Sequence, residues 1–515
     1  MPPVSTRLDE CARLFLLQTN TRRVRRTGAR RTLDGRAAIL PQERPVTTQP
    51  VQKSLASPPP EAWPALVRLA KVAGRPLERF LHIEAASGIS LIVVAAASLL
   101  WANSAWSHSY FELWHTAIGV RIGGFAFERS LEWFVNDVLM VIFFFVVGME
   151  IRREVHEGEL SEWRRAALPA AAALGGMLAP AALYVAFAGA PQLRSGWGVP
   201  MATDIAFAVG ILTLLGKRVP AALRVLLLAL AVIDDLGAIA VIAAFYTSGV
   251  ALTGLAVAAA GALGILALQR FGVRSKLVYV APSLVIWAGV YSAGIHPTIA
   301  GVIVGLLTPV RAWLGPAGFI GGLRDELSKV EQRRGAITPH DLDATLDRVE
   351  LARREAISPA DDLIRTLHPW VAFGIMPVFA LANSGVTVAL DALDRESWHV
   401  IAGVAVGLVV GKPLGVLIAC FLMLRIKLAT LPRGIDPRHL VVLGVVAGVG
   451  FTMSLFIAQL AFADAELLGA AKVGILLASG GAALIGLGLG RLLLSDVDTP
   501  GAAQTADEAE CSTEL

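Results

Sequence analysis

Long apolar stretches recur along the chain from Ala86 to near Leu494, separated by short polar segments. A helix needs roughly 20 apolar residues to cross a bilayer, and most of these stretches approach or reach that length. They predict about twelve transmembrane helices, at 86–106, 133–151, 167–189, 199–216, 222–246, 250–268, 277–293, 297–310, 369–384, 400–424, 440–463 and 473–494. The pattern therefore predicts an all-α polytopic membrane protein.

The composition supports this class. Apolar residues make up 55% of the 515 positions and charged residues 17%, which is more apolar and less charged than a soluble domain requires. The net charge of +4 does not indicate nucleic-acid binding, because the basic residues lie in a tail and in short loops. Cys11, Cys420 and Cys511 show neither a disulfide framework nor the spacing of zinc ligands.

The two ends of the chain differ from the region between them. Residues 1–84 contain the basic stretch TRRVRRTGARR and the proline-rich stretch SLASPPPEAWP, with too little apolar material to offset the entropy of ordering. We expect a disordered cytoplasmic tail, for which attraction of the arginines to anionic lipid is the functional alternative. Residues 496–515 are acidic, small and polar, and they predict a second disordered tail.

The distribution of Lys and Arg predicts the orientation. One set of loops holds Arg152, Arg153, Arg164, Arg165, Lys217, Arg218, Arg224, Arg270, Arg274, Lys276, Arg425, Lys427, Arg433 and Arg438, and the other holds Arg121, Arg129, Arg194, Arg395 and Lys472. Since cytoplasmic loops carry the excess of positive charge, both termini are expected in the cytoplasm. The charged segment 311–366 is then the longest cytoplasmic loop. On the outer side, residues 111–128 with their central Gly-Gly predict a small hairpin.

Two adjacent carboxylates interrupt one apolar run. The stretch AVIDDLGAIA places Asp234 and Asp235 inside the segment 225–245. A charged Asp at the centre of a membrane helix costs roughly 2.5 to 3.5 kcal/mol on insertion scales, so a functional role is the first hypothesis. The structural alternative is a turn between two half-length segments. If the run is one helix, the two side chains point about 100° apart and meet different surroundings.

Other polar positions lie in neighbouring spans. Thr203 and Asp204 occur in a short apolar segment that opens with a proline, and Lys412 lies mid-span. Gly448 and Gly450 precede a further apolar run, where an unwound helix would leave carbonyl groups free to coordinate a cation. Close helix packing is the alternative explanation of this glycine pair.

Three carboxylates and an amine at membrane depth indicate an ion pathway. Small hard cations prefer the oxygen ligands that carboxylates, hydroxyls and carbonyls supply, and carboxylates also bind protons. A cation and protons would therefore compete for the same oxygens, which suffices for exchange if the site opens alternately to each side. The membrane region contains no Walker loop, Gly-x-Ser-x-Gly or HExxH motif, so ATP drive and hydrolysis have no visible basis and we expect no enzyme activity.

Several stretches resemble the NhaA-type sodium/proton antiporters of bacteria. They are MATDIAFAVGIL, AVIDDLGAIAVIA, GKPLG, GVGFTMSLFIA, FVNDVLMVIFFFVVGMEIRRE, SAGIHPTIAGVIVG and LHPWVAFGIMPVFALANSGV. Their order along the chain is that of the family, and the resemblance covers residues 85–495. The resemblance implies an antiporter membrane domain over those residues. It also implies inverted repeats with two interrupted helices, beginning near Val199 and Leu440, that cross near mid-membrane.

The resemblance also implies roles for the site residues. Asp235 would be the principal sodium ligand, Asp234 the partner of Lys412 and a second ligand, and Thr203 a further ligand. Asp204 would compensate the facing helix ends. No cofactor is expected, because Na⁺ and H⁺ are the transported substrates.

Three residues match positions that are linked to the pH response in the family. These are Glu150 and Glu154 in MEIRREVHEG and His368 in LHPW, although a solvated helix end also explains the two glutamates. Where family members often carry an acidic residue and a histidine, this chain has Ile364 and Arg365. We therefore expect exchange to depend less steeply on pH than in a relative that carries the acidic residue and the histidine. His296 is expected to be a packed histidine rather than a ligand.

The expected function is export of cytoplasmic sodium, with lithium as an alternative cation, in exchange for external protons. It would serve pH and sodium homeostasis in the bacterial cytoplasmic membrane. The alternatives are a proton- or sodium-coupled solute symporter on a related fold and a passive channel. Beyond the bilayer and the two ions no partner is indicated, nucleic acid is not expected, and a homodimer is left open.

Overall fold

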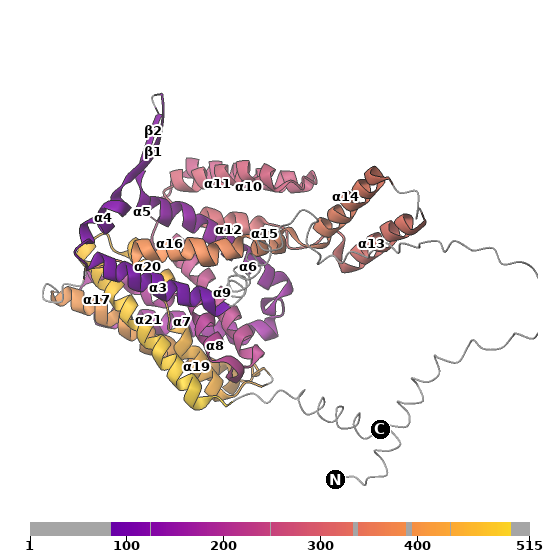
Figure 1. The fold of residues 1–515 in the computed structure, drawn as a ribbon. Helices are drawn as coiled ribbons and strands as arrows, with labels where there is room; N and C mark the ends of the chain where they lie inside the picture. The colour runs from indigo at the N-terminus through magenta and orange to yellow at the C-terminus, as the bar shows by residue number, and fades with distance from the viewer. Residues whose placement is uncertain are drawn as a thin grey trace, which may run out of the picture. The chain divides into compact units, whose positions relative to one another are not determined.

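The computed structural model describes residues 84–123, 125–247, 249–332, 338–387, 394–432 and 434–495. The predicted tails 1–84 and 496–515 lie outside these ranges, apart from Glu84, which begins the first described helix. Figure 1 shows that the described region is almost entirely helical.

Within the described ranges, seven helices are long and apolar enough to cross a membrane. They are α5–η2–α6 (Leu131–Trp133, Phe134–Leu139, Met140–Glu157), α7 (Trp163–Ala188), α9 (Ala221–Phe245), α10 (Leu252–Arg270), α15–η7–α16 (Pro359–Trp370, Val371–Ile375, Met376–Asn383), α17–η9–α18 (Arg395–Val406, Gly407–Gly411, Lys412–Arg425) and α21 (Ala465–Leu493). Two shorter apolar helices are η6–α11 (Lys276–Tyr279, Val280–Ser292) and α12 (Thr298–Leu307).

Three further pairs of helices are bent at a short break. They are α3 and α4 (Glu84–Ala102, Ser107–His115), bent by 110°, η4 and α8 (Pro191–Met201, Ile205–Leu214), bent by 47°, and α19 and α20 (Pro437–Ala447, Phe451–Ala461), bent by 45°. If each pair is one span, up to ten spans are present in the described residues. The all-α polytopic class is confirmed, while twelve membrane crossings stays a prediction.

Three predicted helix starts were too late by eight residues or more. The span expected to start at Val199 is preceded by a 3₁₀ segment from Pro191, and the helix expected to start at Val473 begins at Ala465. The helix expected to start at Pro369 begins ten residues earlier, at Pro359. Proline lacks an N–H and usually ends a helix. Here Pro369 lies inside α15, and the helix continues through Trp370 into the π-helical turn η7.

The helix α9 is continuous from Ala221 to Phe245 and carries Asp234 and Asp235 in its interior. The alternative of a turn between two short segments is therefore excluded. Both aspartates are buried, as expected if they face protein rather than lipid.

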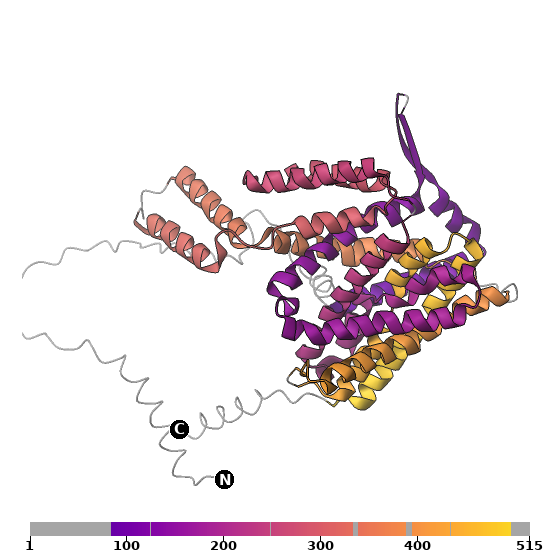
Figure 2. The same cartoon turned by 180° about the vertical axis from the view of Figure 1, so that it is seen from behind.

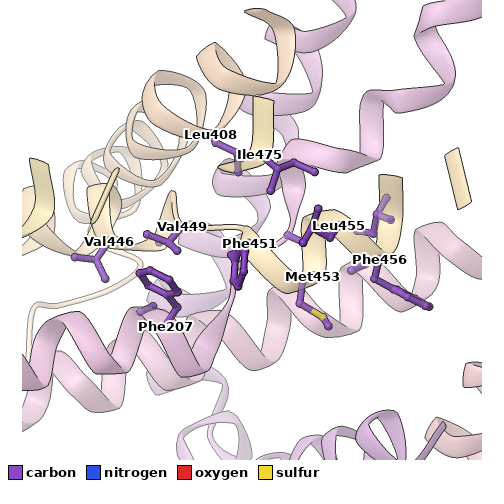
Figure 3. Packing of buried hydrophobic residues seen from close by; sticks show 14 of the residues in the cluster. Phe207, Leu408, Val446, Val449, Phe451, Met453, Leu455, Phe456 and Ile475 are labelled. Atoms are coloured by element: carbon purple, nitrogen blue, oxygen red, sulfur yellow. The ribbon is translucent and has the colours of Figure 1, made fainter. Parts of the chain in front are cut away.

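The two broken spans meet at their breaks. Residues 202–204 separate η4 from α8, and residues 448–450 separate α19 from α20, so the unwinding predicted near Gly450 is confirmed. The backbone N–H of Asp204 donates to the carbonyl of Val449 at 2.8 Å, which joins the two breaks. The rings of Phe207 and Phe451 pack edge to face at 5.8 Å beside this junction (Figure 3). These contacts fix the two interrupted helices against one another.

Smaller elements lie in the connections. Strands β1 (Ala117–Ile122) and β2 (Phe125–Ser130) form the predicted hairpin, although residues 111–115 of that segment belong to α4. The predicted loop 311–366 contains α13 (Gly315–Gln332), α14 (Pro339–Ala356) and the first turns of α15. Figure 2 shows the neighbouring pair α10 and α11 from the opposite side. Short 3₁₀ turns also occur at η3 (Glu159–Ser161) and η5 (Gly216–Arg218).

Candidate ion-binding site

Asp234 and Lys412 form a buried ion pair. The Nζ of Lys412 lies 3.0 Å from the Oδ2 of Asp234, and neither side chain is exposed. The hydroxyl of Thr203 lies 2.6 Å from the same oxygen and 3.2 Å from the carbonyl of Ala447. A hydroxyl carries one proton, so it donates to one acceptor at a time, and the shorter contact is to Asp234. Three predicted site residues are therefore in direct contact.

The C-terminal ends of the half-helices η4 and α19 face the ammonium group of Lys412 and the hydroxyl of Thr203. Lys412 donates to the carbonyl of Met201, the last residue of η4, and Thr203 lies beside the carbonyl of Ala447, the last residue of α19. The last carbonyls of a helix lack intrahelical partners and carry partial negative charge. Lys412 is thus held by a carboxylate and by a helix end.

Asp204 lies at the N-terminal ends of the other two half-helices, α8 and α20. Its Oδ1 accepts from the backbone N–H of Phe207 at 3.0 Å, which caps α8. Its Oδ2 accepts from the backbone N–H and the hydroxyl of Thr452, at 3.1 and 2.5 Å, in the first turn of α20. A carboxylate is stabilised at a helix N-terminus by free N–H groups and by the helix dipole. Asp204 therefore satisfies two such ends at once.

Asp235 is the contrasting carboxylate. It is 2% exposed, and among the described residues neither of its oxygens has a hydrogen-bond partner. The charges that act on it are those of Asp234, Glu150, Asp204 and Lys412. A buried polar group is normally hydrogen-bonded, so a carboxylate with two unpartnered oxygens is a candidate place for a cation or a proton.

The fold places Lys412 through two local features. The π-helical turn η9 ends at Gly411, directly before Lys412 and Pro413, and so accommodates the missing N–H of the proline. Gly175 on α7 and Gly415 on α18 face each other so closely that a Cβ on either would overlap the carbonyl oxygen of the other. Small residues let two membrane helices approach closely, and here they bring Lys412 against the site.

The residues expected to influence the pH response lie on two neighbouring helices. Glu150 is half-buried on α6, and the carboxylate of Glu154 accepts from the backbone N–H of Glu159 at 3.2 Å. His368 is exposed near the end of α15. An ion pair between Arg153 and Asp361, at 3.7 Å, joins the two helices. Glu150 is half-buried rather than fully solvated, and its role in the pH response stays a prediction.

The substituted positions on α15 differ from each other. Ile364 is 7% exposed and belongs to the apolar core, whereas Arg365 is exposed. A glutamate at 364 would thus be buried rather than placed at a solvated mouth.

Sequence reasoning missed one group of polar residues. Asn136, Asn383 and Gln459 form a chain of side-chain amides between η2, α16 and α20. Each is a polar residue at the edge of an apolar run, and this was the available signal. His296 is packed as expected, with its Nδ1 2.8 Å from the hydroxyl of Thr298 and its ring 5.3 Å from that of Phe456.

Comparison with known proteins agrees with this arrangement. Residues 78–489 match the family described as Na+/H+ antiporter 1. The Na(+)/H(+) antiporter NhaA 2 of Myxococcus xanthus is 68% identical over 470 residues, covering 91% of this chain and 99% of that protein. The protein of the same name from Sorangium cellulosum is 54% identical over 462 residues, covering 89% and 99%. The Na(+)/H(+) antiporter NhaA of Bordetella petrii is 48% identical over 461 residues, covering 87% and 98%. With its polytopic helical fold and its two interrupted helices, this chain is a member of the Na+/H+ antiporter 1 family.

Proposed function

We propose that this protein exchanges Na⁺ for H⁺ across the membrane, with Asp235 and Asp234 as the shared binding site of the two ions. The observation that carries the proposal is the buried, unpartnered carboxylate of Asp235 beside the Asp234–Lys412 pair. The relatives named above support the choice of ions.

The geometry suggests how the ions compete. A sodium ion at this site would be coordinated by the unpartnered carboxylate of Asp235. The carboxylate of Asp234 and the hydroxyl of Thr203 would supply further oxygen ligands. As Asp234 turns to the cation, its contact with Lys412 weakens. Protons bind the same carboxylates, so cation and protons exclude one another. Alternate opening to the two sides then gives exchange.

The broken helices provide a supporting frame. Asp204 stabilises two helix N-termini through its hydrogen bonds to Phe207 and Thr452, so it holds the crossing without a free oxygen to offer. We assign it a positioning role rather than that of a ligand. The positive-inside distribution of Arg and Lys supports the placement of both termini in the cytoplasm. We propose that sodium moves outward.

The pH profile of exchange is proposed to depend on residues of α6 and α15. We expect Glu150, Glu154 and His368 to influence opening from their positions on α6 and α15, whereas Arg365 carries a fixed positive charge. We expect exchange to depend on pH through competition at the site, with a shallow profile.

The deciding experiment is sodium-induced pH change in everted vesicles, scanned over pH. Asp235→Asn should abolish sodium-dependent proton movement while the protein still inserts, because the substitution removes the charge that binds the cation. Asp464→Asn is a matched control, since Asp464 caps α21 and asparagine caps equally well. Normal exchange by the Asp235→Asn protein would contradict the site assignment.

The symporter alternative is tested in the same vesicles. A panel of labelled organic solutes should show no uptake that depends on sodium or protons. Solute uptake coupled to either ion, with no sodium-driven proton movement, would overturn the proposed exchange.

A further inference from the structure

Three side-chain amides join one half of a broken helix to the helices beside it. Gln459, on α20, donates its amide to the Oδ1 of Asn383 at the end of α16. The amide of Asn383 donates to the Oδ1 of Asn136 on η2 at 2.8 Å. Asn383 is completely buried, and the other two are half-buried. The chain therefore crosses from α20 through α16 to the start of α6.

An aromatic cluster extends the same contact. Phe456 lies one helical turn before Gln459 on α20 and further from the break than Val449 and Phe451 (Figure 3). Its ring is 5.4 Å from that of Phe144 on α6 and 6.3 Å from that of Phe379 on α16. The amides and the rings thus form one continuous interface between α20 and its neighbours, and Figure 1 shows α16 and α20 close together.

The interface lies toward one side of the bundle. Asn136 follows the β-hairpin, Asn383 precedes the segment 384–394, and Gln459 is close to the end of α20 at Ala461. The positive-inside pattern assigns all three connections to the outer side. Because Asp234 and Asp235 are buried, a cation that leaves on this side requires helices around the site to separate, and the interface of α20 with α6 and α16 lies on this side.

We infer that Gln459, Asn383 and Asn136 form an outer latch for the ion site. They are positioning residues that hold α20, and with it Thr452 at the break, against α6 and α16, and their separation opens the site outward. The inference rests on the proposed exchange and its orientation. Uncharged amides suit this role, because they carry no net charge and do not titrate, so their contact does not depend on pH. A hydrogen bond between membrane helices is also weak enough to break in every cycle.

The test measures access to a buried reporter cysteine directly next to the latch. Ser384 is buried next to Asn383, and among the described residues its hydroxyl has no partner, so Ser384→Cys is a mild replacement. The background carries Cys11→Ser, Cys420→Ala and Cys511→Ser. In right-side-out vesicles, a membrane-impermeant thiol reagent labels this cysteine at a rate that follows the open fraction.

Gln459→Leu should raise the labelling rate roughly three- to tenfold, which corresponds to the loss of one interhelical hydrogen bond in a membrane. The substitution leaves the Oδ1 of Asn383 without its donor from α20. Gln269→Leu is the matched control, because the amide of Gln269 bonds the carbonyl of Leu307 elsewhere in the bundle, at 2.8 Å. The control should label at the parent rate. Should Gln459→Leu fail to insert, Asn136→Ser breaks the other link and should raise the rate in the same direction.

Three results would overturn the latch. They are an unchanged labelling rate in folded Gln459→Leu protein, an equal rise in Gln269→Leu, and a rise confined to inside-out vesicles. Labelling does not require transport, so the proposed function is judged separately from sodium-driven proton movement of the parent in the same vesicles.

Discussion

Removal of Lys412 should destabilise the protein as well as stop transport. Its ammonium group is completely buried and lies 3.0 Å from Asp234. Lys412→Ala leaves that carboxylate with the single donor Thr203 and leaves the carbonyl of Met201 without its donor from Lys412. Breaking a buried pair by removing one partner costs about 3 to 5 kcal/mol, because an uncompensated charge stays in low dielectric. We expect a loss of that size in the free energy of unfolding.

A double substitution isolates the pair. Asp234→Asn with Lys412→Gln replaces the ions by neutral amides of similar shape, so the double variant should be more stable than Lys412→Ala or Lys412→Gln alone. Contacting residues show interaction energies of about 0.5 to 3 kcal/mol, and a buried ion pair should lie at the upper end of that range. None of these variants should carry out exchange, since each of them lacks the ammonium group of Lys412.

The assay is reversible unfolding of purified protein in mixed micelles, followed by circular dichroism. Asp235→Asn is the matched control, because it makes the same change at the next residue, where the structure gives the carboxylate no partner to lose. It should lower the stability little or not at all. The reasoning would be refuted if the double variant unfolded as easily as the less stable single variant, or if Asp235→Asn were as damaging as Lys412→Ala.

Three further predictions address the frame, the tail and the pH response. Gly415→Ala should lower the melting temperature and the exchange rate together, because a Cβ would push α18 from α7, and a variant that melts like the parent would contradict this contact. Removal of residues 1–75 should leave exchange in everted vesicles unchanged, since the family match begins at residue 78, and loss of activity in correctly inserted protein would show otherwise. Arg365→His should steepen the pH profile of exchange, whereas Ile364→Glu should mainly reduce stability because that side chain is buried; an unaltered slope with histidine at 365 would contradict the first expectation.

The sequence located the buried charged residues of the candidate site, because charge inside apolar runs is a strong signal. Asp204, Asp234, Asp235 and Lys412 each interrupt a span, and the structure brings all four into one buried region. The glycines at 448 and 450 indicated the break between α19 and α20. Membrane helices cannot hide such groups in lipid, so they converge inside the bundle.

Other features depend on tertiary packing and left weak signals. The amide chain of Asn136, Asn383 and Gln459 consists of ordinary neutral residues that are well separated in sequence, and their meeting depends on how three helices pack. The helix start at Pro359 was missed because the polar residues before Pro369 suggested a loop, whereas a cap at Ser358 begins the helix there. The local sequence pattern does not distinguish a loop from a helix at this position.

The three carboxylates of the site differ in how completely the protein satisfies them. Asp204 receives hydrogen bonds at both oxygens from two helix N-termini, so its charge is needed where it stands. Asp234 has one oxygen paired with Lys412 and Thr203 and the other unpartnered, so it is able to turn toward a new ligand. Asp235 has no hydrogen-bond partner in the described structure, although leaving a buried charge uncompensated is costly. A stable protein retains such a group where another species supplies the missing compensation, and both a proton and a sodium ion are able to do so. The number of protein partners thus falls from Asp204 through Asp234 to Asp235. We infer that this difference separates the carboxylate that holds the helices in place from the carboxylates that bind the exchanged ions.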